Sequence, residues 1–432
     1  MTAGSPLSLL RALRPGPLAP GDEYRRPATR ANSHVHLPPN FSAFASATEA
    51  TELAAAQGVR VLGTSNYYDY SVYTSFSEQA CRRGVFPLFG MEVICLDEDL
   101  QQASMRVNDP ANPGKMYLCG KGVSGFAPMS GTASDLMGLL RRSDSARSAA
   151  LIERLEAVFS AAGAALGMTE ASVKALVARR YGAPIETVYL QERHVALACQ
   201  EAVFNLVPVQ ERSHLLTSVL GVEVKPDAPA VQVQDFIRAQ LMKRGRPAYV
   251  GETFPSFDHV YRLVLALGGI PCYPVLADGA TPVCEFEQDV EGLVASLQER
   301  GTHCAELIPN RNEPEVLREY VTALRGAGMP VLAGTEHNTL EMIPIEPQCA
   351  RGAPVPEDLR EVFWEGICVV AAHQYLMARG EEGYVDANGE LTGGYPGAEA
   401  RLEAFARLGA SVIDEYLKLA TPARWAVQGA QE

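Results

Sequence analysis

Residues 31–36 read ANSHVH, residues 48–58 read TEATELAAAQG and residues 59–64 read VRVLGT. The first and last of these segments have the composition of short strands. The middle segment has the period of a helix and ends at a glycine, Gly58. A strand, a helix and a second strand in immediate succession predict a parallel sheet or a barrel, because parallel neighbours need such a crossover.

The alternation of strands and helices continues along the chain and is interrupted by a long stretch with helical periodicity. Further strand patterns occur at residues 85–96, 270–276, 302–309 and 329–338, and helical patterns at 71–84, 257–269, 289–301 and 313–328. We therefore expect an α/β core at residues 31–128 and 252–345, with a helical insertion at 129–251. An N-terminal arm at 1–30 and a helical segment at 346–432 flank this core. Whether the C-terminal segment covers the core or forms a homo-oligomer stays open.

Composition and charge exclude several classes of protein. The 432 residues are 47% hydrophobic and 20% charged, which is ordinary for a globular chain with a large core. A formal net charge of −14, without any run of five basic residues, argues against nucleic acid as the primary ligand. Nine cysteines without CxxC spacing indicate scattered thiols in a reducing cytoplasm. The apolar runs are too short to cross a membrane, so we expect no membrane association.

The sharpest chemical feature is the pair His34 and His36, at the end of the first strand pattern. Residues i and i+2 of a strand point to the same face, so two imidazoles can reach one metal ion. Two solvent-facing or capped histidines would show the same spacing. The pair alone therefore leaves both interpretations open.

Two further positions carry groups that can bind a metal ion. Glu92 lies within an apolar strand pattern, and a buried carboxylate there needs a metal ion or a cation as its partner. Glu336, His337 and Asn338 stand at the end of the last strand pattern, where barrel active sites lie. The structural alternatives are an ion pair for Glu92 and a simple turn after the last strand.

Several of these segments together resemble the polymerase-and-histidinol-phosphatase (PHP) family. The resembling segments are HVHLPPNFSAF (34–44), GVRVLGTSNYY (58–68), VFPLFGMEV (85–93), ERHVALACQ (192–200) through MKRGRPAYVGE (242–252), FDHVYRLVLALGGIPCYP (257–274), THCAELIP (302–309) and VLAGTEHN (331–338). The resemblance implies a distorted (β/α)7 barrel with a helical insertion and a helical C-terminal extension. It also implies a metal-dependent hydrolase that acts on phosphate esters.

Carried over residue by residue, the resemblance implies metal ligands at His34, His36 and Glu92, with His194 as the ligand from the insertion. The chain departs from the family at three motifs. These are Thr64-Ser65-Asn66 in place of Thr-Asp-His, Cys272-Tyr273-Pro274 in place of Ala-His-Pro, and Glu336-His337-Asn338 in place of Asp-x-His. Either Glu336 or His337 is expected to serve as a ligand in the last motif. This degenerate set implies one or two divalent ions, and its donors suit Zn, Mn or Fe.

The expected substrate is a small anionic, phosphorylated metabolite, held by cations near the strand ends. Arg193 is the favoured cation, because arginine binds phosphate through paired hydrogen bonds. Lys115, Lys121 and Arg311 are further candidates, and Lys121 lies in the glycine-rich segment 116–126.

Five side chains are expected to contact the substrate or to act in catalysis. Asn66 and Asn338 are expected to contact the substrate, and Arg193 and His194 to act in catalysis. Tyr273 would take the place of a missing imidazole, either as a general acid or as an aromatic that only fills the space. On spacing alone, His194 also fits an ordinary surface helix.

Three functions remain open from the sequence. The first is a phosphoesterase that acts on a small metabolite. The second is a metal-dependent hydrolase, lyase or isomerase that acts on a sugar or carbonyl compound. The third is a barrel that has lost catalysis and binds a ligand or a partner.

Overall fold

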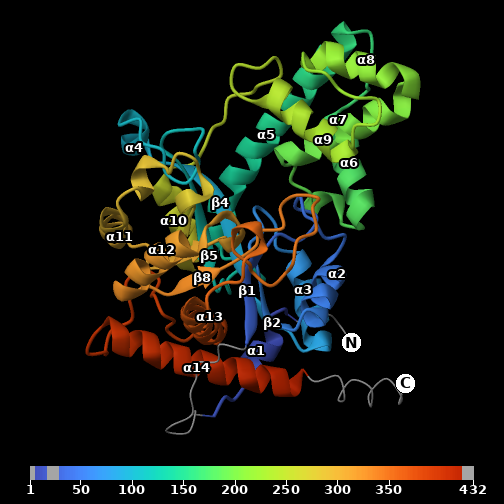
Figure 1. The fold of residues 1–432 in the computed structure, drawn as a ribbon. Coiled ribbons are helices and arrows are strands. Elements are labelled where there is room, and N and C mark those ends of the chain that lie inside the picture. The colour runs from blue at the N-terminus through green and yellow to red at the C-terminus, as the bar shows by residue number, and fades with distance from the viewer. Residues whose placement is uncertain (1–4, 17–28, 421–432) are drawn as a thin grey trace, which may run out of the picture. The chain divides into compact units, whose positions relative to one another are not determined.

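The computed structural model describes residues 5–16 and 29–420 (Figure 1). The chain divides into two compact units. Unit 1 comprises Met1–Leu37, Ser46–Met137 and Pro255–Glu432, and unit 2 comprises Pro38–Ala45 and Gly138–Phe254. The helical insertion that the sequence predicts at 129–251 overlaps unit 2.

Unit 1 holds two β-sheets, with strand orders β1-β2-β3 and β4-β5-β6-β7-β8. The strands are β1 (Arg30–Val35), β2 (Val59–Thr64), β3 (Phe86–Leu88), β4 (Gly90–Leu96), β5 (Lys115–Lys121), β6 (Ile270–Val275), β7 (Cys304–Leu307) and β8 (Val331–Ala333). All pairings are parallel except those of β5, which is antiparallel to both β4 and β6. The predicted α/β class is confirmed. The first part of the glycine-rich segment 116–126, as far as Lys121, lies in β5.

The strands do not form one continuous seven-stranded barrel, so this finer prediction is not confirmed. Within residues 5–16 and 29–420, the strand pairing that links the two sheets is limited to isolated bridges, between Val35 and Glu336 and between Asn66 and Met91. Glu336 and His337 have positive φ angles of 61° and 51°, which ends the extended backbone soon after β8. The pairing between β8 and β1 therefore stops at a single bridge.

Helices cover the sheets of unit 1 (Figure 1). They are α1 (Ser8–Ala12), α2 (Ala47–Ala56), α3 (Val72–Arg83), α4 (Glu98–Gln102), α10 (Phe257–Ala266), α11 (Val290–Glu299), α12 (Pro314–Gly326), α13 (Glu357–Ala378) and α14 (Ala398–Leu419). The predicted glycine stop of α3 is confirmed, because Gly84 caps this helix with a φ of 64°.

The C-terminal helices complete the core of unit 1. Helix α13 contacts β1, β3 and β8, and α14 packs along α13 (Figure 1). Two glycines allow this close approach, because a Cβ at Gly366 would lie 2.2 Å from the Val331 carbonyl oxygen, and one at Gly409 would lie 1.8 Å from that of Cys368. The C-terminal segment therefore covers the sheets, the first of the two roles that the sequence left open.

The described part of the N-terminal arm docks on the same helix. Leu7, Leu10 and Leu13 are buried, and α1 contacts α13. The Arg11 side chain donates a hydrogen bond to the carbonyl oxygen of Ala378, at 2.9 Å.

Unit 2 is a helical unit with its own hydrophobic core. It contains most of α5 (Gly131–Ala161), together with α6 (Glu170–Tyr181), α7 (Glu192–Leu206), α8 (Val209–Leu220), α9 (Ala230–Ile237) and a π-helical turn (Arg238–Met242). Its buried apolar residues include Leu155, Phe159, Val177, Val195, Cys199, Val203, Leu216 and Ile237.

Across residues 5–16 and 29–420, none of the helices has the length and apolar character needed to span a lipid bilayer.

The contact between α13 and α14 gives a prediction about stability. We expect Gly409→Ala to lower the free energy of unfolding by about 1–3 kcal/mol or more, because the new Cβ meets backbone that cannot move aside easily. Urea unfolding followed by circular dichroism measures the change. Gly326→Ala is the matched control, since its Cβ would have nothing within 4 Å. Equal stabilities of the two variants would contradict the packing described for α14.

Candidate metal centre

The centre is built at the end of β1. Alternation along β1 and the residues after it directs His34 and His36 to the same side, and both side chains are fully buried. The backbone of Glu336, in the loop after β8, holds this segment in place. Its N–H donates to the carbonyl oxygen of His34, and its own carbonyl oxygen accepts from the N–H of His36, each at 2.8 Å.

Three donor atoms converge in this buried space. The Nε2 atoms of His34 and His36 lie 3.3 Å apart. Oε2 of Glu92, on β4, lies 3.1 Å from Nε2 of His36 and 3.8 Å from Nε2 of His34. Among the described residues, this carboxylate oxygen has no hydrogen-bond partner of good geometry. Two nitrogens and one oxygen at this spacing fit the ligand set of a divalent ion, because such ions bind donors at about 2.0–2.2 Å and leave them 3–4 Å apart. The structure thus brings together His34, His36 and Glu92 as a candidate metal site.

Glu306 on β7 fixes the orientation of His34. Its Oε2 lies 2.7 Å from Nδ1 of His34, and its Oε1 accepts from the Ser33 hydroxyl at 2.5 Å. Burial alone would raise the pKa of Glu306, but Lys121 and His34 lower it to about 2. The anionic carboxylate therefore accepts the Nδ1 proton of His34 and leaves the Nε2 lone pair directed at the candidate site.

Lys121 lies inside unit 1, with only 3% of its side chain exposed. Its Nζ atom lies 2.7 Å from Glu306 and 3.1 Å from the Ser65 hydroxyl oxygen. Burial disfavours its charge, but Glu306 outweighs this effect and raises the pKa of Lys121. The expected contact between Lys121 and an anionic substrate gains no support from this geometry, because the ammonium already neutralises a buried carboxylate.

Tyr67 closes one side of the candidate site. Its ring stacks on that of His36, with centroids 5.1 Å apart and planes inclined by 5°. Burial, followed by the charge of Glu92, raises the pKa of Tyr67 well above its usual value. Burial would also raise the pKa of Glu92, but the adjacent His36 and His34 hold it below its usual value. The site therefore combines a carboxylate with a protonated phenol.

Asn66 stabilises the segment that carries the histidines. Its Oδ1 accepts from the N–H of Leu37 at 2.8 Å, and its Nδ2 donates to the carbonyl oxygen of Leu37 at 2.9 Å. Both ends of the side-chain amide are thus used within the protein. The predicted substrate contact of Asn66 stays a prediction that this geometry does not favour.

The predicted ligand Glu336 has an arginine partner. Nη1 of Arg311 donates to Oε1 of Glu336 at 2.9 Å, Nη2 donates to Oε2, and Asn338 donates to Oε2 at 2.7 Å. The Glu336 side chain is therefore held in a bidentate ion pair beside the histidines. The Arg311 side chain is 36% exposed, so solvent reaches the cation of this pair.

Both ring nitrogens of His337 lie within hydrogen-bonding distance of oxygens of its own loop. Its Nδ1 lies 2.7 Å from the Thr335 hydroxyl oxygen, and its Nε2 lies 3.1 Å from the carbonyl oxygen of Ile343. Burial lowers its pKa to about 4. A neutral ring with both nitrogens in hydrogen bonds is poorly placed to bind a metal ion.

Tyr273 on β6 also has a partner outside the candidate site. Its hydroxyl donates to Oε1 of Glu287 at 2.8 Å, whereas the neighbouring Cys272 pairs in register with Cys119 and Cys304. Successive residues of a strand point to opposite faces, so Tyr273 is directed away from the side of the sheet that carries Glu306. The role expected of Tyr273 in the site stays a prediction, which this geometry does not favour.

His194 and Arg193 belong to α7 of unit 2. His194 is buried, its Nδ1 accepts from the N–H of Gln191 at 3.0 Å, and burial lowers its pKa to about 3. Arg193 stacks over the ring of Phe41, which belongs to the same unit. The roles expected of both residues stay predictions.

The sequence did not single out Glu306 as a functional residue. Glu306 lies within an apolar strand pattern, as Glu92 does, so the same signal was present. No local pattern in the sequence predicted the stacking of Tyr67 on His36 or the pairing of Arg311 with Glu336. Each of these contacts joins segments that are far apart in the sequence.

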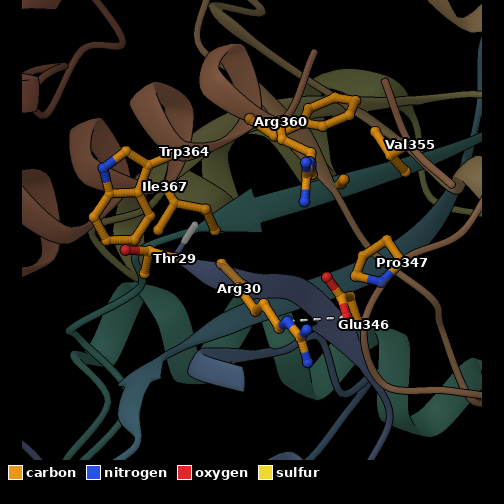
Figure 2. Close-up of a pocket in the computed structure, with 11 residues that line it drawn as sticks. Thr29, Arg30, Glu346, Pro347, Val355, Arg360, Trp364 and Ile367 are labelled. Atoms are coloured by element: carbon orange, nitrogen blue, oxygen red, sulfur yellow. Dashed lines mark ion pairs between the residues drawn. The ribbon is translucent and has the colours of Figure 1, made fainter. Parts of the chain in front are cut away.

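Unit 1 also contains a small cavity at the opposite end of β1 (Figure 2). Arg30 pairs there with Glu346 at 3.2 Å, and Trp364 and Arg360 line the wall. Its volume of about 40 Å³ is far below the roughly 300 Å³ or more of a typical metabolite site. This cavity is therefore not a candidate substrate site.

Comparisons with known proteins identify a solved structure that shares the fold of this chain. No family model matches the chain, and no curated protein matches it. Among solved structures, the chain resembles a protein from Bifidobacterium adolescentis named as a candidate metal-dependent phosphoesterase, with 15% identity and a TM-score of 0.51 over 78% of this chain and 96% of that chain. It also resembles an amidohydrolase from Chromobacterium violaceum, with 15% identity and a TM-score of 0.47 over 74% of this chain and 94% of that chain. The first likeness shows that the two chains share a fold. The PHP resemblance stays a prediction.

The position of Tyr273 gives a prediction about stability and pH. Burial raises the pKa of Glu287 from its usual 4.5 to about 7, and the hydrogen bond from Tyr273 limits this rise. Tyr273→Phe should therefore raise this folded-state pKa further. A carboxyl group with a raised folded-state pKa lowers the free energy of unfolding once the pH exceeds that pKa, because the folded protein must then hold the buried charge. The variant should therefore lose more of its free energy of unfolding, relative to the wild type, at pH ~8 than at pH ~5. In urea unfolding, we expect the free energy of unfolding to fall by about 2–3 kcal/mol at pH ~8 and by about 1 kcal/mol at pH ~5.

Tyr320→Phe is the matched control, because the Tyr320 hydroxyl donates to the backbone carbonyl oxygen of Glu287 at 2.7 Å. Its effect should be the same at both pH values. An equal loss for Tyr273→Phe at the two pH values would contradict the coupling to Glu287.

Proposed function

We propose that the chain is a metal-dependent hydrolase that acts on a small anionic, phosphorylated metabolite. The observation that carries this proposal is the convergence of His34, His36 and Glu92, with donor atoms 3.1–3.8 Å apart. The hydrogen bond between Glu306 and Nδ1 of His34 supports it, because metal-binding histidines commonly donate their second N–H to a carboxylate. The fold shared with the Bifidobacterium protein is consistent with this function.

His34, His36 and Glu92 would hold the metal ion, and Zn, Mn and Fe suit their nitrogen and carboxylate donors. The chemistry that such an ion supplies when bound is activation of water near neutral pH and stabilisation of negative charge on a phosphoryl oxygen. Glu306 keeps the Nε2 lone pair of His34 directed at the site. The stacked ring of Tyr67 excludes water from one face of His36.

Arg311 is the proposed anion-binding residue. The Arg311 side chain is paired with that of Glu336, and the Glu336 backbone is hydrogen-bonded to the backbones of His34 and His36. These contacts place Arg311 close to the donor atoms. Its planar guanidinium can bind two oxygens of a phosphate, as it binds the two oxygens of Glu336. Its partial exposure lets an incoming anion compete with Glu336 for these N–H groups.

The proposal is tested by removing and restoring the metal. The protein is treated with EDTA, dialysed and assayed for phosphate release from a panel of phosphorylated metabolites, with and without Zn, Mn or Fe. His36→Ala should lose the bound metal and lower the rate by about 100-fold or more, because the ion contributes several kcal/mol to catalysis.

His259→Ala is the matched control, since Nε2 of this histidine lies 3.0 Å from the carbonyl oxygen of Leu136. It should retain both metal and activity. Phosphate release that is indifferent to EDTA and to His36→Ala would refute the proposal. Turnover of a lactone or an amide in place of every phosphate ester would favour the carbonyl substrates that the sequence left open.

Arg311 allows a second prediction about the same reaction. We expect Arg311→Lys to raise KM for the phosphorylated substrate about 10-fold, because lysine keeps the charge but loses the paired hydrogen bonds. Steady-state kinetics measure the change. Arg318→Lys, in the exposed pair with Asp358, is the control and should leave KM unaltered.

Glu336→Gln separates the two roles considered for Glu336. If Glu336 only pairs with Arg311, the variant should keep its metal and lower KM, because the arginine is then less tightly held. Loss of the metal in this variant would support the role of ligand that the sequence predicts.

A further inference from the structure

A second group of potential metal donors lies next to the first. It consists of His34, Cys119 and Glu306, whose donor atoms lie within 4.8 Å of one another and are buried. A nitrogen, a thiol sulfur and a carboxylate oxygen form a set that soft divalent ions such as Zn and Cd bind well. Since His34 belongs to both groups, a metal ion at each would make a two-ion centre.

The ammonium of Lys121 already lies in this second group. Its Nζ is 2.7 Å from Glu306 and 3.5 Å from Nδ1 of His34, two of the three residues of this group. The Ser65 hydroxyl and the backbone carbonyl oxygen of Ser33 complete its surroundings, at 3.1 and 3.4 Å. The buried carboxylate neutralises the charge of the ammonium, and the polar contacts provide its hydrogen-bond acceptors. Together they form a binding site that one positive charge already occupies.

A metal ion cannot share this space with the ammonium. Both would need the same carboxylate, and two positive charges a few ångströms apart repel strongly where water is excluded. A metal ion there would also need Nδ1 of His34 as a ligand, and would displace the proton that this atom donates to Glu306. The hydrogen bond that orients His34 toward the first group would then be lost.

We propose that Lys121 takes the second cation position of the centre, so that the chain binds a single divalent ion at His34, His36 and Glu92. This inference rests on the proposed function, because it requires the first group to bind a metal ion. Within that function, Lys121 supplies a permanent positive charge in place of a second ion. Lys121 is a positioning residue, because its contact is with Glu306, which in turn contacts His34.

Cadmium binding to the full-length apo protein tests the proposal. Cd²⁺ bound by a thiolate gives an ultraviolet charge-transfer band, which reports on Cys119, and calorimetry gives the number of ions bound. The wild-type protein should bind one ion without a thiolate band. Lys121→Ala removes the ammonium, and should bind two ions with a band of one thiolate.

Two further variants control this experiment. Lys121→Arg keeps the positive charge and should behave as the wild type. Lys121→Ala combined with Cys119→Ser should lose the band, which excludes cadmium bound by the other cysteines. Circular dichroism checks folding. If Lys121→Ala does not fold, the number of ions and the absence of a band in the wild type and in Lys121→Arg still test the inference.

The outcomes separate this inference from the function on which it rests. Two ions or a thiolate band in the wild type would overturn it and leave the proposed hydrolase intact, as would a single ion without a band in folded Lys121→Ala. If the wild-type protein bound none of Cd, Zn or Mn, both the proposed function and this inference would fail.

Discussion

The buried carboxylate of Glu306 is the group on which the centre depends. It lies on β7 and binds Ser33 and His34 of β1 and Lys121 of β5, so that one side chain joins three strands. A buried charge of this kind is tolerated only when its partners are complete, and removing one partner typically costs about 3–5 kcal/mol. The same contacts that satisfy Glu306 also fix the ring of His34. Stability and site geometry are therefore linked in this protein.

Two ion pairs of unit 1 differ in how deeply they are buried. Lys121 and Glu306 are buried and neutralise each other, whereas Arg311 and Glu336 lie where solvent reaches the guanidinium. The ammonium of Lys121 is closed off from solvent, whereas the guanidinium of Arg311 is partly exposed, so under the proposed function Arg311 is the cation of these two that an incoming anion reaches. Under the proposed function, this difference in depth favours Arg311 over Lys121, two of the four cations predicted from the sequence, as the residue that binds an anionic substrate.

Local patterns predicted some of these features and missed others. The spacing of His34 and His36 and the position of Glu92 in an apolar strand predicted donors that the structure brings together, because alternation along a strand is a local property. For Tyr273 and His337, local patterns left the surroundings of the side chain undetermined. An aligned motif gives a position along the chain, but neither the face toward which Tyr273 points nor the loop carbonyl that binds His337 can be read from it.

Local sequence patterns were sufficient to predict the α/β class, the helical stretch between the two parts of the core, and the pair of imidazoles on one face of a strand. Each follows from periodicity or from the chemistry of neighbouring residues. Local patterns did not predict that Lys121 is an internal counter-ion, that Glu336 binds Arg311, or that the strands form two sheets. These features depend on contacts between segments tens to hundreds of residues apart in the sequence, and burial then fixes which charges must be neutralised within the protein.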